Sequence, residues 1–198
     1  DHPIARCLSL AADLERRFGL RLAEVVPTDP EHPDGLVGVG HATAAHLERY
    51  LRSPTPITLG IGTGRTLKAA VEQMSAFDCS QHKIVSMTGN IAPDGAAAYF
   101  SVIYNVADKT KARCYPFPVP VIASSVDERE TLSRQPLILS NLRLIEEAET
   151  IFVGVAGVGP DAPLVKDGFL SASELDALRD AGAVGEITGW AFDRAGRP

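Results

Sequence analysis

Apolar residues recur at helical spacing at the start of the chain. One face of a helix is formed by Cys7, Leu10, Leu14 and Phe18. Gly19 follows at the position of a C-cap glycine, which predicts the end of this helix. The next segments predict a strand over residues 20–26, a surface loop over residues 28–40 and a second helix over residues 44–51.

From residue 57 onward, short β-rich runs alternate with segments of helical periodicity. Strands are predicted over residues 57–61, 83–87, 113–115 and 151–155. Helices are predicted over residues 67–74, through Tyr99, Val102, Ile103 and Val106 with Asp94 as N-cap, from Val126, and, after Pro136, through Ile138, Leu142 and Ile145. This alternation indicates a largely parallel sheet covered by helices, so the predicted fold class is α/β.

The C-terminal quarter carries a distinct helix signal. Ser171 and Glu174 have the spacing of a capping box, which predicts a helix that ends near Gly182. Residues 185–192 then predict a strand. Earlier in the chain, the proline-rich run over residues 116–120 must be extended, because each proline fixes its own φ and restricts the residue before it.

Composition narrows the class of protein. The 198 residues are 45% hydrophobic and carry a net charge of −6, which fits a single domain spanning residues 1–198 that builds its own core. No run of Lys and Arg matches a phosphate backbone, so this segment alone is predicted to bind nucleic acid poorly. Cys7, Cys79 and Cys114 are odd in number and far apart, which favours the reducing cytoplasm, and no apolar stretch approaches the roughly 20 residues of a membrane span.

The most specific local signal is the glycine-rich loop that follows the strand predicted over residues 57–61. Gly62, Thr63, Gly64, Arg65 and Thr66 open a helix, where free backbone amides, hydroxyls and a guanidinium predict an anion site, most naturally for phosphate. A turn without ligand remains the alternative. A dinucleotide site is disfavoured because Arg65 stands where the third glycine of that motif belongs, and no Gly-Lys-Ser/Thr follows as in a P-loop.

Three further segments are candidates for the same site. Thr88, Gly89 and Asn90 follow the next strand and should lie beside the glycine-rich loop if the two strands are neighbours. Gly157 and Gly159, in the glycine-rich segment 154–159, could bring bare backbone against a ligand, or could simply form turns. Glu186 occupies an apolar β-rich stretch, where a carboxylate needs a partner or a functional reason.

Catalytic signatures are mostly missing from the sequence. There is no nucleophile elbow, and His41 and His46 are five residues apart, which places them on different faces of a helix and argues against a metal pair. The five histidines are predicted on loops or solvated faces, and the three cysteines in packing roles. No catalytic residue, metal or cofactor is therefore assigned.

Read together, these segments resemble the sugar-binding effector domain of SorC-type bacterial transcriptional regulators over nearly the whole chain. The resemblance is carried by Phe18-Gly19-Leu20, Ile61-Gly62-Thr63-Gly64-Arg65-Thr66-Leu67, Tyr115-Pro116-Phe117-Pro118-Val119-Pro120, Leu175 to Leu178, and Gly182-Ala183-Val184-Gly185-Glu186-Ile187. It implies a Rossmann-like domain related to sugar-phosphate isomerases and glucosamine-phosphate deaminases, acting as a sensor without chemistry. A sugar-phosphate isomerase or deaminase, or a nucleotide or acyl-CoA binding module, remains the alternative.

The resemblance also assigns roles and partners. It implies that the loop from Gly62 to Thr66 holds the phosphate of a sugar-like effector, that residues 88–90 line the site, and that Glu186 accepts hydrogen bonds from sugar hydroxyls. The regulator is expected to form a homodimer or homotetramer and to bind operator DNA through a helix-turn-helix domain. That domain and a final α/β unit are expected to be absent from this chain, which begins at Asp1 without Met.

Overall fold

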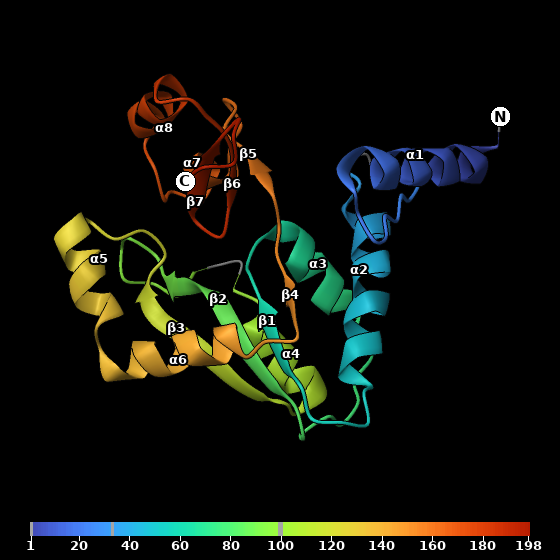
Figure 1. Ribbon diagram of the computed structural model, residues 1–198, viewed down its shortest axis with the longest axis horizontal. Coiled ribbons are helices and arrows are strands. Elements are labelled where there is room, and N and C mark those ends of the chain that lie inside the picture. The colour runs from blue at the N-terminus through green and yellow to red at the C-terminus, as the bar shows by residue number, and fades with distance from the viewer. Residues whose placement is uncertain (1, 33, 99–100) are drawn as a thin grey trace.

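A four-stranded parallel sheet forms the larger part of the computed structural model, which describes residues 2–32, 34–98 and 101–198 (Figure 1). Its strands are β1 (Thr58–Ile61), β2 (Lys83–Ile91), β3 (Arg113–Pro120) and β4 (Thr150–Phe152). They lie in the order β3-β2-β1-β4, and every neighbouring pair is parallel. The α/β fold class predicted from the alternation of strands and helices is confirmed.

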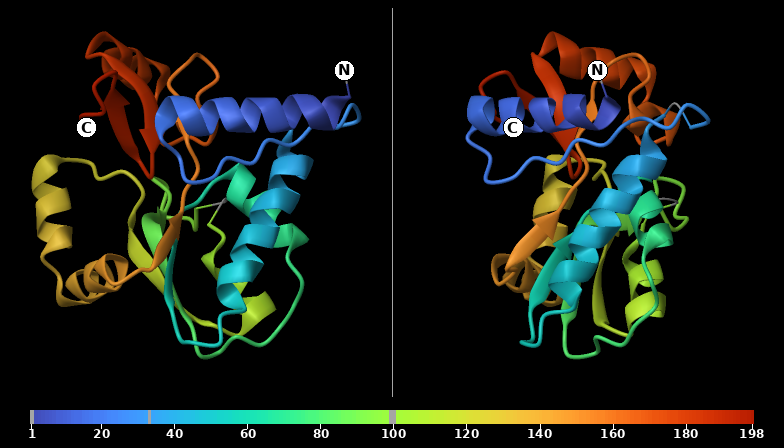
Figure 2. Two further views of the ribbon diagram at one scale, coloured as in Figure 1. Left: turned by 45° about the vertical axis from the view of Figure 1, so that its right-hand side comes forward. Right: turned by 90° about the vertical axis from the view of Figure 1, so that its right-hand side faces the viewer.

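Helices cover both faces of this sheet (Figure 2). One face carries α2 (Leu36–Leu51), α3 (Arg65–Gln73) and α4 (Ile103–Thr110), and the other carries α6 (Pro136–Glu146), preceded by α5 (Val126–Ser133). The main hydrophobic core lies between α2, α3, α4 and the strands β1 and β2, where Leu47, Leu59, Ile61, Val71 and Ile84 are almost fully buried. Residues 36–152 are called the sheet lobe below.

A second, smaller unit follows β4 and is called the small lobe, residues 156–198. It contains a three-stranded antiparallel sheet of β5 (Ala156–Gly157), β6 (Ala183–Ile187) and β7 (Trp190–Asp193), together with α7 (Pro163–Lys166) and α8 (Ala172–Asp180). The capping box that begins α8 is confirmed, because Ser171 and Glu174 exchange hydrogen bonds as predicted. The single strand expected over residues 185–192 is wrong, because the chain turns at Thr188 and Gly189 to form a β6–β7 hairpin.

The N-terminal segment departs from its prediction in two places. Helix α1 (Pro3–Phe18) ends at Gly19 in a left-handed conformation, as expected. Residues 20–26 are not a strand, because this segment pairs with no other strand of the described chain and leaves Leu22 exposed. The predicted loop 28–40 ends early, since α2 begins at Leu36. Gly40 belongs to that helix and allows close packing, because a Cβ there would lie 3.3 Å from Ala69.

The segment after β2 is also different from the prediction. Thr88, Gly89 and Asn90 belong to β2 itself, because the extended proline-rich run of β3 continues the pairing up to Ile91. Asp94 does not cap a helix: its carboxylate accepts the Ala96 N–H at 2.9 Å in a tight turn, and α4 begins only at Ile103. The predicted helical position of Tyr99 lies outside the described residues.

One histidine is more deeply placed than predicted. His82 lies in the connection before β2, but its side chain is fully buried. Its Nδ1 accepts the Ile57 N–H at 3.1 Å, and its Nε2 lies 3.0 Å from the Leu51 carbonyl oxygen. The ring therefore satisfies backbone groups at the end of α2 and the start of β1, which is a structural role.

Candidate functional site

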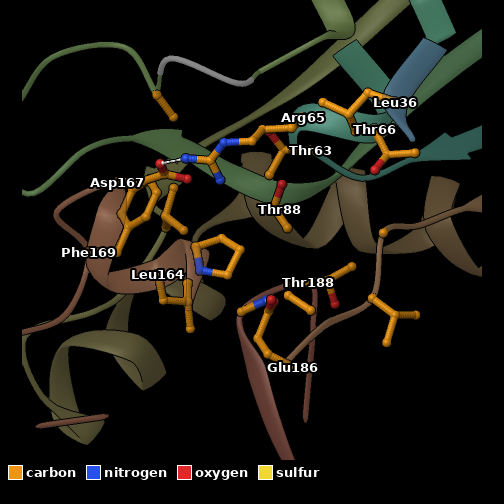
Figure 3. A pocket seen from close by; sticks show the side chains of 18 residues that line it. Leu36, Thr63, Arg65, Thr66, Thr88, Leu164, Asp167, Phe169, Glu186 and Thr188 are labelled. Atoms are coloured by element: carbon orange, nitrogen blue, oxygen red, sulfur yellow. Dashed lines mark hydrogen bonds and ion pairs between the residues drawn. The ribbon is translucent and has the colours of Figure 1, made fainter. Parts of the chain in front are cut away.

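A cavity of about 250 Å³ lies where the sheet lobe meets the small lobe, and it is called the seam cavity below (Figure 3). The sheet lobe contributes the β1–α3 loop and the end of β2. The small lobe contributes α7 and the β6–β7 turn, and the connection over residues 154–156 completes the wall. Ligands of open parallel sheets bind beyond the carboxyl ends of the strands, and the seam cavity occupies that position.

The β1–α3 loop and the N-terminus of α3 line one side of the seam cavity. Four candidates from the sequence line it, namely Thr63, Gly64, Arg65 and Thr66. Gly64 has φ 119°, which favours glycine, and a Cβ at this position would meet no atom within 4 Å. Gly64 is the N-cap residue of α3 and has no side chain with which to cap the helix. The helix dipole and the backbone amides of the first turn make the N-terminus of α3 a favourable place for an anion.

Thr88 supplies an independent sign of a ligand. Its side chain extends from β2 into the seam cavity beside Thr63 and Arg65, because β1 and β2 are parallel neighbours (Figure 3). The residue is 6% exposed, and its Oγ1 has no hydrogen-bond partner among the described residues. Burying an unpartnered hydroxyl costs about 1–3 kcal/mol, so this atom is placed as a bound ligand would require.

An ion pair crosses the seam cavity. Arg65, at the start of α3, pairs through its Nη2 with Asp167, which directly follows α7 in the small lobe (Figure 3). The Arg65 side chain is 36% exposed and that of Asp167 is 15% exposed. Sequence reasoning found Arg65 but not Asp167, because the partners are 102 positions apart and no motif links them.

The small lobe contributes a second carboxylate. Glu186, on β6, lines the cavity, and its carboxylate accepts the backbone N–H of Gly189 in the β6–β7 turn. Burial raises the pKa of Glu186 above its ordinary value, and the Gly189 hydrogen bond opposes this only in part. Thr188, missed by the sequence analysis, lies in the same turn with a left-handed φ of 54°. Leu36, Leu164 and Phe169 form apolar parts of the wall.

Five predicted site residues lie outside the lining of the seam cavity. Gly62 lies just before the lining residues, and its N–H donates to the Phe152 carbonyl at 2.8 Å. Gly89 allows β3 to approach, because a Cβ there would lie 2.3 Å from the Pro120 oxygen. Asn90 donates from Nδ2 to the Tyr104 hydroxyl at 3.1 Å. Gly157 and Gly159 line a separate open groove on the small lobe.

The described residues contain neither a metal-ligand cluster nor a membrane-spanning helix. No group of three or more His, Cys, Asp or Glu side chains is placed there to share a metal ion. Within the same residues, every helix is too short or too polar to cross a membrane.

Comparison with known proteins assigns the chain to a family. The family model "Putative sugar-binding domain" (Sugar-bind) matches residues 2–198. The erythritol catabolism regulatory protein EryD of Brucella abortus is 32% identical over 197 residues, which cover 100% of this chain and 62% of that protein. The transcriptional regulator LsrR of Klebsiella pneumoniae is 28% identical, over 97% of this chain and 57% of that protein. This chain thus spans about 60% of the length of these relatives.

Solved structures agree on the fold. A DeoR family transcriptional regulator from Listeria monocytogenes has a TM-score of 0.81 at 21% identity, covering 95% of this chain and 74% of that one. The sorbitol operon regulator SorC from Klebsiella pneumoniae has a TM-score of 0.75 at 20% identity, covering 94% and 60%. The chain belongs to the family described as a putative sugar-binding domain, which agrees with the resemblance to the sugar-binding domain of SorC-type regulators.

Proposed function

We propose that this chain is the effector-sensing domain of a transcriptional regulator and that the seam cavity binds a phosphorylated sugar or polyol without converting it. The observation that carries the proposal is that two features meet in the seam cavity. These are the N-terminus of α3, whose N-cap residue is Gly64, and the buried hydroxyl of Thr88, which has no hydrogen-bond partner among the described residues. A polar ligand would supply a partner for this hydroxyl, and the helix N-terminus favours an anionic ligand.

The two sides of the seam cavity suit the two ends of such a ligand. On the sheet-lobe side, Thr63, Thr66 and the α3 amides can donate hydrogen bonds to a phosphate. On the small-lobe side, the Glu186 carboxylate can accept hydrogen bonds from sugar hydroxyls. A volume of about 250 Å³ is slightly below the roughly 300–1,000 Å³ of drug-sized pockets, which suits a small metabolite.

The relatives support this class of ligand. EryD is named for erythritol catabolism, and SorC for the sorbitol operon. Both names point to polyol metabolism, so we propose a phosphorylated polyol or sugar as the effector here. The curated relatives are regulators, which favours a sensor over the isomerase or deaminase alternative.

The remaining proposals concern the full-length protein. We propose that it acts in the cytoplasm as a homodimer or homotetramer and binds operator DNA through a separate helix-turn-helix domain. Effector binding would favour the oligomeric arrangement that binds the effector better, which changes operator affinity by linkage. A further α/β unit would pack beside β4, an edge strand of the sheet where Ile151 is 44% exposed.

The test is a thermal-shift screen with paired phosphorylated and unphosphorylated four- to six-carbon sugars and polyols. A ligand at about 100 times its Kd should stabilise the chain by roughly 2.7 kcal/mol, which raises Tm by several degrees. We expect such a shift with phosphorylated compounds and no product in chromatography of the mixture. Turnover of a ligand would instead support the enzyme alternative, and the absence of any shift would contradict the proposed site.

Calorimetry of two arginine variants tests the phosphate assignment. Arg65→Ala should weaken a phosphorylated ligand far more than its unphosphorylated partner. Arg179→Ala is the matched control, because Arg179 belongs to the open groove of the small lobe and lies outside the seam cavity lining. Equal loss of affinity for both ligands in Arg65→Ala would exclude a role in phosphate binding.

A further inference from the structure

The Arg65–Asp167 ion pair differs from the other ion pairs that the structure describes. Most of those join residues three or four positions apart on exposed surfaces, and exposed pairs contribute little to stability. Arg65 and Asp167 instead come from different lobes and face one another across the seam cavity. The pair therefore belongs to the proposed binding site.

The charges around the seam cavity oppose a free anion. Among the described lining residues, Arg65 is the single basic side chain, whereas Asp167 and Glu186 are both acidic. Figure 3 shows the Arg65 side chain extended toward Asp167 and away from Thr66 at the start of α3. A phosphate at the N-terminus of α3 would therefore compete with the Asp167 carboxylate for the same guanidinium.

We propose that Asp167 is a specificity-determining residue that competes with the phosphate of the effector for Arg65. This inference rests on the proposed function, since it concerns the anionic end of the same ligand. Inorganic phosphate must displace Asp167 and gains contacts only at the sheet-lobe side. A sugar phosphate also gains hydrogen bonds to the small lobe, which offset the loss of the ion pair. Asp167 thus allows the seam cavity to reject free phosphate and to accept a ligand that has both a phosphate group and a sugar moiety.

Displacement of Asp167 from Arg65 by the phosphate also links ligand binding to the contact between the two lobes. The Arg65–Asp167 pair joins the start of α3 to the end of α7. A bound effector replaces this direct bond with a bridge through the ligand. A second contact, the Arg129 guanidinium 5.5 Å from the Trp190 ring centroid, joins α5 to β7 and lies outside the cavity lining. The position of α7 therefore responds to the ligand.

The test uses inorganic phosphate as the probe in calorimetric titration. Asp167→Asn removes the competing charge at constant shape and should strengthen phosphate binding by about tenfold or more, as expected for a close charge contact. Asp161→Asn is the matched control, because it removes a carboxylate of the small lobe that pairs with Lys166 and lies outside the cavity lining. It should leave phosphate affinity unchanged. Arg65→Gln in the Asp167→Asn background should abolish the gain.

Each outcome separates this inference from the proposed function. Unchanged or weaker phosphate binding in both Asp167→Asn and Asp167→Ser, with melting curves showing folded protein, would overturn the competition. If the unmodified chain binds a sugar phosphate while neither variant gains phosphate affinity, only the inference fails. If the variants gain phosphate affinity but no sugar phosphate binds the unmodified chain, the competition is supported and the proposed effector class fails.

Discussion

The two lobes of the molecule differ sharply in how they are stabilised. In the sheet lobe, buried apolar side chains from three helices and two strands form one continuous core. In the small lobe, the buried hydrophobic cluster consists of Val158, Ala162 and Leu175. A unit of roughly 40 residues with so small a core is marginal by itself. The small lobe therefore depends on the sheet lobe and on whatever binds between them.

This difference fits a sensor. The proposed phosphate contacts come from the stable sheet lobe, whereas Asp167, Glu186 and Thr188 come from the small lobe. A ligand that contacts both lobes orders mainly the less stable one. Segments of low local stability are the ones that respond to ligands, because little free energy is needed to change their conformation.

Truncation of one leucine in each lobe gives the largest expected contrast. Leu59 is fully buried in β1. Leu59→Ala should therefore lower the free energy of unfolding by about 2–5 kcal/mol and lower Tm by roughly 5–15 °C. Leu175→Ala, in the small lobe, should speed amide hydrogen exchange in residues 156–198 while the sheet lobe stays protected. Hydrogen exchange with mass spectrometry distinguishes the two patterns. A uniform increase in exchange with Leu175→Ala would show that the lobes unfold as one unit.

Two glycines extend the contrast to backbone packing. Gly89→Ala should destabilise by about 1–3 kcal/mol, because its Cβ would overlap the backbone of Val119 and Pro120 in β3. Gly157→Ala should change stability by no more than about 0.5 kcal/mol, since its Cβ would meet no atom within 4 Å. Denaturant unfolding measures both. Equal costs would mean that the small lobe packs as tightly around Gly157 as the sheet lobe does around Gly89.

Sequence patterns predicted the sheet lobe better than the connections. Alternation of strands and helices identified β1, β3, β4 and the helices that follow the strands, and the signal is clearest for β1, whose buried residues read as an apolar run. The strand over residues 20–26 was wrong, because a strand also requires a partner that periodicity does not reveal. The end of β2 was missed because pairing with the proline-rich β3 extends it, and proline is usually a sign that pairing stops.

The residues of the candidate site likewise fall into those that local sequence signals predicted and those that they did not. Thr63, Gly64, Arg65 and Thr66 were found because a glycine-rich loop before a helix is a local signal, and Thr88 because parallel neighbours end at one edge. Asp167 and Thr188 were missed, since they reach the cavity through the placement of the small lobe. Only tertiary contacts establish that placement, so the local sequence around Asp167 and Thr188 does not predict that they line the cavity.

Thr88→Val tests whether the buried Thr88 hydroxyl lowers the stability of the sheet lobe while it contributes to ligand binding. Its hydroxyl is buried without a partner in the described chain, so the variant should be as stable as the original or up to about 1 kcal/mol more stable, and should bind the effector about tenfold more weakly. Thr110→Val is the control, because that buried hydroxyl donates to the Val106 carbonyl at 2.6 Å and its loss should destabilise by about 1 kcal/mol. Thermal melts and calorimetry read both effects. Equal destabilisation would assign Thr88 a structural role.

Glu186→Gln should have the smallest effect on stability, and its sign depends on pH. Burial raises the pKa of Glu186, so the folded state holds its proton more tightly than the unfolded state and stability falls as pH rises above about 4.5. The variant should therefore melt slightly higher than the original protein at pH 7, with the difference vanishing near pH 4. Its amide oxygen can still accept the Gly189 N–H, while its affinity for sugar hydroxyls should fall.

Glu174→Gln provides the control of opposite sign within the small lobe. The Ser171 N–H and hydroxyl lower the pKa of Glu174, so this carboxylate stabilises the folded state above about pH 4.5 and loses that contribution as pH falls through its lowered pKa. Glu174→Gln should thus melt lower than the original protein at pH 7 and converge with it in acid. Melting curves between pH 3 and pH 7 compare the pair. If both variants shift in the same direction, burial is not what distinguishes Glu186, and its carboxylate is stabilised in the cavity even without a ligand.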